Sequence, residues 1–164
     1  MKKILFVCLG NICRSPMAEF IMKDEVRRQN REGEFWIASA GTSGEEEGNP
    51  VYPPARAELA KHGISCEGKR AKKFLPSDYS AYDYILCMEN SHVRELRRQT
   101  GDPDKKIFRL LDFTSSPHDI ADPWYTRNFS LAYAQIAEGV RAFLLFLQKG
   151  DEAQQKVMVR SAGK

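Results

Sequence analysis

The amino-acid sequence predicts an α/β protein: a doubly wound, four-stranded parallel sheet in a three-layer arrangement with helices on both faces. Short, continuous apolar runs, as expected of strands buried on both faces, alternate along the chain with segments of helical periodicity. This alternation predicts parallel strands joined by right-handed helical crossovers. The 164 residues, 42% hydrophobic and 29% charged, suffice for one substantial core and are too few for two domains.

The first strand is predicted at residues 4–7, Ile-Leu-Phe-Val, with Cys8 at its carboxyl end. After a short loop, Ser15 and Pro16 indicate the start of a helix. The hydroxyl suits the N-cap, and Pro in the first turn lacks an N–H that would be unpaired there anyway. Apolar runs at residues 35–38, 84–88 and 107–111 predict the other three strands, with helices between them.

The last helix has the clearest pattern. Its apolar side chains share one helical stripe: Ile136, Val140, Phe143, Leu144 and Leu147. Ser130 is the candidate N-cap and Gly150 the expected stop. We therefore expect one domain at residues 1–150, followed by a polar, flexible tail at residues 151–164.

The expected strand order is 2-1-3-4. In that order the chain reverses its direction of winding beside strand one, and ligands of open α/β sheets bind outside the strand ends at such a point. Cys8 lies there. The segment that begins at this point, Cys8-Leu-Gly-Asn-Ile-Cys-Arg-Ser15, therefore occupies the expected binding position.

This segment has the chemistry of a phosphate monoester site. A loop clamped between a strand and a helix can turn its N–H groups inward on an anion, and the helix N-terminus adds a positive field. The same field stabilises a thiolate, so Cys8 is the predicted nucleophile. The planar fork of Arg14 can hold two phosphoryl oxygens. The predicted phosphate-binding residues are Leu9, Gly10, Asn11, Ile12, Cys13, Arg14 and Ser15.

Individual positions of the loop have separate roles. Gly10 permits a close backbone approach, Asn11 tolerates a left-handed turn, and the Ser15 hydroxyl can donate to the sulfur as it departs. The opposing interpretation makes Cys8 an inert buried thiol and Arg14 a surface charge. That interpretation requires a strand, a Gly-Asn turn, an Arg and a Ser-Pro helix start to coincide by accident.

The loop resembles that of the low-molecular-weight protein tyrosine phosphatases, whose signature Cys-Leu-Gly-Asn-Ile-Cys-Arg-Ser is present unaltered at residues 8–15. The resemblance covers about residues 1–150. It implies a cysteine-dependent phosphomonoesterase that hydrolyses protein phosphotyrosine through a cysteinyl-phosphate intermediate and releases inorganic phosphate. It also implies that Asn11 holds the loop conformation and that Ser39, in Ser39-Ala-Gly-Thr42, supports the loop.

Such an enzyme needs an acid for the leaving oxygen and then a base for the attacking water. The chain offers Asp122 in Ile120-Ala-Asp-Pro-Trp-Tyr125, where Pro123 fixes the backbone. Asp-Pro alone is a weak signal, but its place before the last helix matches the general-acid loop of the family that the chain resembles. Trp124 and Tyr125, together with Ile12, are the predicted walls of the substrate pocket.

Three segments depart from the family's usual pattern. The acidic Gly44-Glu-Glu-Glu-Gly48 stands where an aromatic wall is usual, Gly68 where some members carry a loop-supporting His, and Met88-Glu-Asn-Ser-His92 where Met-Asp-x-Ser-Asn is familiar. If residues 45–47 border the pocket, they repel acidic residues that flank a phosphotyrosine and favour basic ones. A solvated turn that points away from the site is the open alternative.

Three other functions share parts of this pattern. An arsenate reductase of related fold has the same Cys-to-Arg loop but needs further cysteines to relay a disulfide; here Cys87 lies in a predicted core strand and Cys66 stands alone. Phosphoarginine phosphatases resemble this loop with Thr in place of Ile12, so Ile12 favours the tyrosine interpretation. A non-catalytic phosphate-binding module is expected to have lost Cys8 or Asp122, and both are present.

The sequence indicates neither a metal nor another cofactor. His62, His92 and His118 are scattered without metal-ligand spacing, and Arg14 with the loop amides supplies the positive field that a metal supplies elsewhere. A net charge of +3 does not by itself imply nucleic acid or a membrane. The expected partners are therefore phosphotyrosine-containing proteins or peptides. The apolar start is too short for a signal peptide, so a reducing cytoplasm is expected.

Cys13 lies in the same tight loop as Cys8 and is a candidate redox partner. A sulfenic acid formed on Cys8 can be captured by Cys13 as a disulfide, which protects the nucleophile from irreversible oxidation. The alternative is that Cys13 is only a small, buried packing residue.

Overall fold

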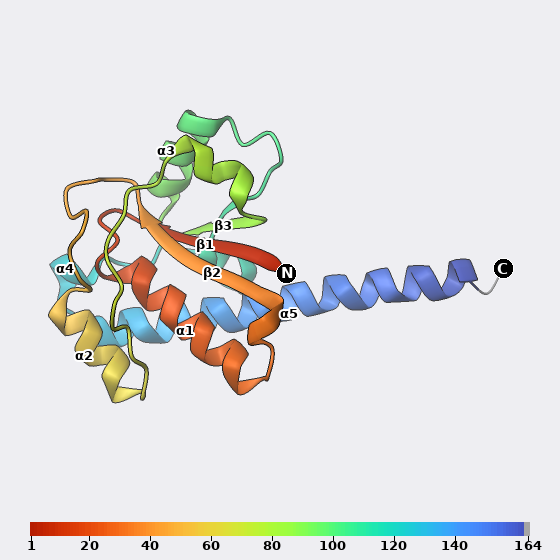
Figure 1. The fold of residues 1–164 in the computed structure, drawn as a ribbon, viewed down its shortest axis with the longest axis horizontal. Helices are drawn as coiled ribbons and strands as arrows, with labels where there is room; N and C mark the ends of the chain where they lie inside the picture. The colour runs from red at the N-terminus through yellow and green to blue at the C-terminus, as the bar shows by residue number, and fades with distance from the viewer. Residues whose placement is uncertain (163–164) are drawn as a thin grey trace.

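The computed structural model describes residues 1–162 and contains one four-stranded, all-parallel sheet (Figure 1). Its order β2-β1-β3-β4 confirms the predicted 2-1-3-4 topology. The strands are β1 (Lys2–Cys8), β2 (Phe35–Gly41), β3 (Tyr84–Cys87) and β4 (Ile107–Arg109). The helices are α1 (Arg14–Arg28), α2 (Pro53–Lys61), α3 (Asn90–Thr100), α4 (Pro123–Thr126) and α5 (Phe129–Ala162). Short 3-10 helices occupy Glu32–Glu34, Pro76–Ala81 and Leu110–Phe113.

Strand β1 is central and is buried on both faces. It pairs in parallel with β2 on one side and β3 on the other. Ile4 and Phe6 belong to the larger hydrophobic cluster on one face, and Leu5 and Val7 belong to the smaller cluster on the other. This two-sided burial explains why the strand is a continuous apolar run in the sequence.

Helices cover both faces of the sheet, as expected. Helices α1, α2 and α5 pack below the sheet in Figure 1, and α3 lies above it. The larger cluster receives Met17 and Met22 from α1 and Ile136 and Val140 from α5. These layers leave the carboxyl ends of the strands free, and the loop that follows β1 lies at that edge.

The fourth strand is shorter than its apolar run. β4 ends at Arg109, because the Asp112 carboxylate accepts the Arg109 N–H at 3.0 Å and turns the chain into a 3-10 helix. Leu110 and Leu111 stay buried and pack against α5. Their apolar character therefore reflects packing against a helix and not strand pairing.

The predicted ends of the last helix are wrong. Asn128, not Ser130, caps the helix: its Oδ1 accepts the Leu131 N–H at 3.0 Å. Helix α5 passes through Gly150 to Ala162, so the expected domain boundary falls inside a helix. A glycine lowers helix propensity by only about 1 kcal/mol, and the residues that follow it include good helix formers. Lys2 pairs with Asp151 at 3.2 Å, and beyond this point α5 extends away from the domain (Figure 1).

Within the described residues, α5 is the one helix long and apolar enough to cross a membrane by length and composition. Phe143 and Leu147 of this helix are buried in the larger hydrophobic cluster. Packing on the sheet therefore accounts for much of the apolar character of α5.

Candidate active site

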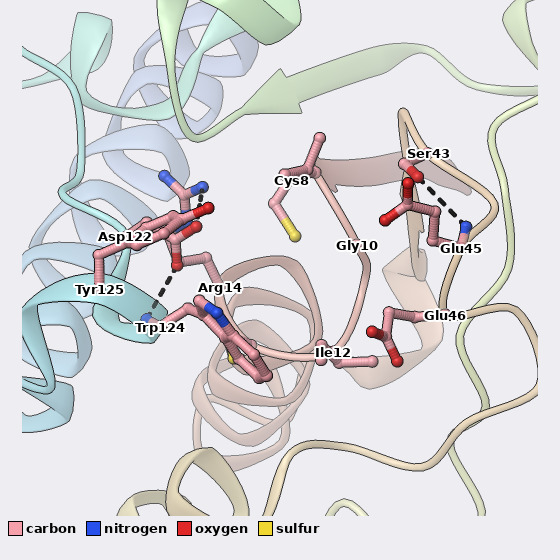
Figure 2. Close-up of a pocket in the computed structure, with 12 residues that line it drawn as sticks. Cys8, Gly10, Ile12, Arg14, Ser43, Glu45, Glu46, Asp122, Trp124 and Tyr125 are labelled. Carbon is pink, nitrogen blue, oxygen red and sulfur yellow. Dashed lines mark hydrogen bonds and ion pairs between the residues drawn. The ribbon is translucent and has the colours of Figure 1, made fainter.

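A pocket of about 190 Å³ opens at the carboxyl end of β1 (Figure 2). Its floor is the predicted phosphate-binding loop at residues 8–14, called the phosphate loop below, with Cys8 and Arg14 among the lining residues. Asp122, Trp124 and Tyr125 form one wall, and the loop of Ser43, Glu45 and Glu46 forms the other. The structure thus brings Cys8, Arg14 and Asp122 together from separate parts of the chain. The predicted wall residues Ile12, Trp124 and Tyr125 all line the same pocket.

The Cys8 sulfur is 2.9 Å from the Ser15 hydroxyl. Ser15 was expected to cap α1, and this expectation is wrong: Cys13 is the N-cap residue, and no side chain caps the helix. The Ser15 hydroxyl instead accepts an N–H from Asn11 at 2.8 Å, which leaves its own proton for Cys8. The competing acceptor, the Ala40 carbonyl, is farther away at 3.4 Å. This geometry supplies the sulfur with a hydrogen-bond donor.

Asn11 holds the loop through every polar atom of its side chain. Its amide N–H groups donate to Ser15 and to Ser39 at 3.0 Å, and its carbonyl accepts the Lys72 N–H at 3.0 Å. Its φ of 60° confirms the predicted left-handed conformation. The residue is fully buried, so losing any of these bonds leaves an unsatisfied polar atom.

A buried charge fixes the direction of this hydrogen-bond chain. The Ser39 hydroxyl donates to the Glu19 carboxylate at 2.6 Å and therefore can only accept from Asn11. Lys23 and Lys69 flank the carboxylate at 2.6 and 3.5 Å. Burial lowers the pKa of Lys69, and the nearby Glu19 opposes that shift. The sequence prediction missed Glu19 and Lys69, although Lys69 directly follows the glycine noted as a departure.

Arg14 is almost fully buried beneath the pocket, with 1% exposure. Its Nη1 lies 2.6 Å from Glu89 and donates to the Ile120 carbonyl at 2.7 Å, while Nη2 lies 3.3 Å from Asp122. A buried guanidinium is costly unless it is paired, and these three oxygen partners satisfy that requirement. The sequence prediction missed Glu89, because nothing local to residue 89 indicates a contact with residue 14.

Asp122 lies at the start of the one-turn helix α4. Its Oδ1 accepts the Trp124 N–H at 3.0 Å, so the carboxylate is the N-cap, and Pro123 occupies the first turn. Its Oδ2 faces Arg14. One carboxylate oxygen is therefore fixed by the helix, and the other is directed at the floor of the pocket.

Gly41, at the end of β2, is a glycine on which the packing of the loop after β1 depends. A Cβ on Gly41 would lie 2.6 Å from the Leu9 carbonyl and 3.1 Å from the Asn11 nitrogen. A Cβ on Gly10 would meet only side chains, the nearest being Glu46 at 3.4 Å. The end of β2 therefore presses on the back of the loop, and a side chain at Gly41 would displace it.

Two of the three acidic residues border the pocket. Glu45 and Glu46 line it opposite Asp122, and Glu47 does not. Glu46 also accepts an N–H from Asn49 at 2.7 Å, which holds its carboxylate in place. The alternative of a turn that points away from the site is therefore wrong for residues 45 and 46.

The four cysteines are free and buried. Burial raises the pKa of Cys13 to about 12, with smaller contributions in the same direction from Cys8 and Asp122. Burial also raises the pKa of Cys66 and of Cys87. These three thiols are therefore protonated at neutral pH.

His92 lies behind Arg14 and is buried. Its Nδ1 accepts the Glu89 N–H at 3.2 Å, and its Nε2 lies 3.6 Å from the Glu89 carboxylate. Burial and then the charge of Arg14 lower the pKa of His92 to about 4, against the opposing charges of Glu89 and more distant Asp122. The imidazole is therefore neutral at pH 7.

Comparison with known proteins identifies a family that matches nearly the whole chain. Residues 3–163 match the family described as low molecular weight phosphotyrosine protein phosphatase. The low molecular weight protein-tyrosine-phosphatase YfkJ of Bacillus subtilis is 39% identical over 152 residues, which cover 91% of this chain and 97% of that protein. Its crystal structure aligns with a TM-score of 0.88 over 92% of this chain and 96% of that chain, at 38% identity.

Two further relatives are informative. The human low molecular weight phosphotyrosine protein phosphatase is 38% identical over 87% of this chain and 94% of that protein. A Drosophila arginine phosphatase structure aligns with a TM-score of 0.82 at 30% identity, over 90% of this chain and 98% of that chain. The alignment with this chain covers nearly the whole length of each of these two relatives.

The buried His92 predicts a pH-dependent loss of stability. Its folded-state pKa of about 4 lies below the ordinary value of 6.5, so the unfolded chain binds the proton more tightly. The neutral His92 therefore makes its full contribution to the free energy of unfolding above pH 6.5, and this contribution is lost as the pH falls toward 4. We expect the free energy of unfolding to fall by about 2 kcal/mol more between pH 7 and pH 5 in the wild type than in His92→Asn. Urea unfolding at both pH values checks this, and equal losses in the two proteins contradict it.

Proposed function

The chain belongs to the low molecular weight phosphotyrosine protein phosphatase family, and from this we propose that Cys8, Arg14 and Asp122 carry out its reaction. Members of this family are phosphoric monoester hydrolases with a cysteine-based mechanism. The observation that carries the assignment is the lining of one pocket by the Cys8 thiol, the Arg14 guanidinium and the Asp122 carboxyl.

In the first half of the reaction the Cys8 thiolate attacks phosphorus, and the bond from phosphorus to the ester oxygen breaks. Asp122 gives its proton to the departing oxygen. Arg14 exchanges its contact with Asp122 for phosphoryl oxygens, while Glu89 and the Ile120 carbonyl keep the guanidinium in place. The product of this step is a cysteinyl-phosphate and a free hydroxyl compound.

In the second half water attacks the phosphorus, and the bond from sulfur to phosphorus breaks. Asp122, now a carboxylate, accepts the proton of the attacking water. The Ser15 hydroxyl, 2.9 Å from the sulfur, donates to the thiolate as it leaves. The step regenerates Cys8 and releases inorganic phosphate.

The walls of the pocket favour an aromatic phosphate ester. Trp124 and Tyr125 stand on one side of the pocket, and the apolar side chain of Ile12 lies to the right of Trp124 in Figure 2. Apolar and aromatic surfaces suit a tyrosyl ring better than the charged guanidinium of phosphoarginine. Phosphotyrosine in proteins or peptides is therefore the proposed substrate. Because one structural relative is a Drosophila arginine phosphatase, phosphoarginine is the substrate against which phosphotyrosine should be compared.

The acidic wall selects the residues that flank the phosphotyrosine. Glu45 and Glu46 face the pocket from the side opposite Trp124, and Glu45 is exposed to solvent. A peptide entering between these walls meets negative charge on one side. Basic flanking residues are favoured there and acidic ones disfavoured.

Cys13 is the proposed redox partner of Cys8. Peroxide oxidises the Cys8 thiolate to a sulfenic acid; the Cys13 sulfur then attacks it, forming a disulfide and releasing water. Because burial raises the pKa of Cys13, capture is slow at neutral pH. The need to keep Cys8 reduced, and the four free thiols, support a cytoplasmic location.

The general-acid assignment predicts a dependence on the leaving group. Asp122→Ala should lower kcat/KM for phenyl phosphate by about 10²–10⁴-fold and for an ester of a strongly acidic phenol far less, because that phenolate leaves without a proton. Cys8→Ser should abolish turnover of both esters and of a phosphotyrosine peptide. Equal losses on the two esters in Asp122→Ala would remove Asp122 as the acid. Faster hydrolysis of phosphoarginine than of phosphotyrosine would overturn the substrate assignment.

The acidic wall predicts a preference for cationic peptides. At low salt, a phosphotyrosine peptide with Lys at the flanking positions should exceed its Glu counterpart in kcat/KM by up to about fivefold for each charge pair. The preference should shrink in high salt. Replacing Glu45 and Glu46 by Gln should abolish it, and the matched Glu47→Gln should preserve it. An unchanged preference in the double variant contradicts the role of this wall.

The redox assignment predicts reversible inactivation that depends on Cys13. After prolonged exposure to excess peroxide, dithiothreitol should restore wild-type activity and fail to restore that of Cys13→Ser. The recovered fraction should rise from pH 7 to pH 9, because the thiolate fraction of a group with a pKa of about 12 grows about tenfold per pH unit there. Equal recovery in the two proteins would show that Cys13 is only a packing residue.

A further inference from the structure

Tyr52 touches both the phosphate loop and the helix that carries Asp122. It is the half-buried residue directly before α2, and it does not line the pocket. Neither the phosphate loop nor the Asp122 segment contains it, and no motif of the sequence indicates it. Its place between the two catalytic segments suggests a mechanical role.

The backbone of Tyr52 is fixed to the phosphate loop. Its N–H donates to the Ile12 carbonyl at 2.9 Å. Its carbonyl accepts the Arg56 N–H at 3.0 Å and so begins helix α2. Tyr52 therefore moves with the loop that holds Cys8.

The side chain of Tyr52 is fixed to α4 and the residue after it. Its ring centroid lies 4.7 Å from that of Trp124 at an interplanar angle of 49°. Its hydroxyl accepts an N–H of Arg127 at 3.1 Å, and the Arg127 guanidinium lies 5.4 Å from its ring. Arg127 is the C-cap of α4, with a left-handed φ of 61°.

Helix α4 is thus held at both ends. Asp122, at its start, is paired with Arg14, and Trp124 and Arg127 are held by Tyr52. The contact with Arg14 must yield when Arg14 turns to a phosphoryl group. The contacts with Tyr52 then hold α4, and with it the Asp122 carboxyl, at a fixed position relative to the phosphate loop.

We propose that Tyr52 is a positioning residue that sets the distance between the general acid and the ester oxygen that departs when Cys8 attacks phosphorus. The proposal rests on the assignment of Asp122 as the acid. Both partners are exposed, but the ring contact with Trp124 carries most of the effect, because it packs two aromatic surfaces together, whereas a polar contact from an exposed guanidinium is weak. When Tyr52 is removed, Asp122 is still present, but its carboxyl is no longer held at the right distance from the departing oxygen.

The test is the ratio of kcat/KM for 4-nitrophenyl phosphate to that for phenyl phosphate. Both esters place an aromatic ring against Trp124, so a change in this wall of the pocket affects both values of kcat/KM equally and cancels in their ratio. The value of kcat/KM reports only the steps up to the transfer of the phosphoryl group to Cys8. Tyr52→Ala should lower kcat/KM for phenyl phosphate about tenfold and for 4-nitrophenyl phosphate less than about twofold. Tyr52→Phe, which keeps the ring, should change the ratio less than about twofold.

Two controls separate positioning from general damage. Tyr133→Ala removes another half-buried tyrosine, which stacks on His62 outside the pocket, and should leave the ratio unchanged. In an Asp122→Ala background, Tyr52→Ala should cause no further change in the ratio. Equal losses on both esters in Tyr52→Ala overturn the proposal, as does a further change without Asp122. If Asp122→Ala alone leaves the ratio unchanged, the acid assignment has failed instead.

Discussion

The site depends on one buried positive charge, the guanidinium of Arg14. A cation with 1% exposure is stable only when oxygens surround it, and here they come from Glu89, Ile120 and Asp122. These partners come from two other parts of the chain: Glu89 follows β3, and Ile120 and Asp122 directly precede α4. Pairing Arg14 therefore draws the phosphate loop, the end of β3 and the acid loop onto one point. In the proposed reaction the same charge neutralises a phosphoryl group.

A second constraint acts from below the loop. The Glu19 carboxylate cannot donate, so Ser39 donates to it and must accept from Asn11, and the Asn11 amide nitrogen donates both to Ser39 and to Ser15. Because Ser15 accepts from Asn11, its own proton is free to point at the Cys8 sulfur, 2.9 Å away. The proposed nucleophile is thus linked to a buried carboxylate and its lysine partners, which do not line the pocket.

The sequence predicted the features that are local along the chain. The predicted phosphate loop is contiguous, the strands are continuous apolar runs, and the alternation of strands and helices indicates a parallel sheet. Glu89 and Glu19 could not be found in this way, because their roles exist only once the sheet brings them beneath residues 8–15. The predicted helix ends were wrong for a related reason. The Ser15 hydroxyl contacts the Cys8 sulfur and does not cap α1. A glycine alone does not end a helix, and α5 continues through Gly150. The acidic wall was visible as composition, but only its geometry separates Glu46 from Glu47.

The most direct test of this account is the identity of the phosphorylated residue. Asp122→Ala should still transfer phosphate from an ester with a good leaving group but should activate water poorly, so the intermediate should accumulate. Rapid acid quenching, followed by mass spectrometry of the peptide that contains residues 8–14, is predicted to find one phosphate on Cys8. Phosphate on another residue, or steady turnover with no phosphorylated enzyme at any quench time, would contradict the assignment of Cys8 as nucleophile and Asp122 as the base.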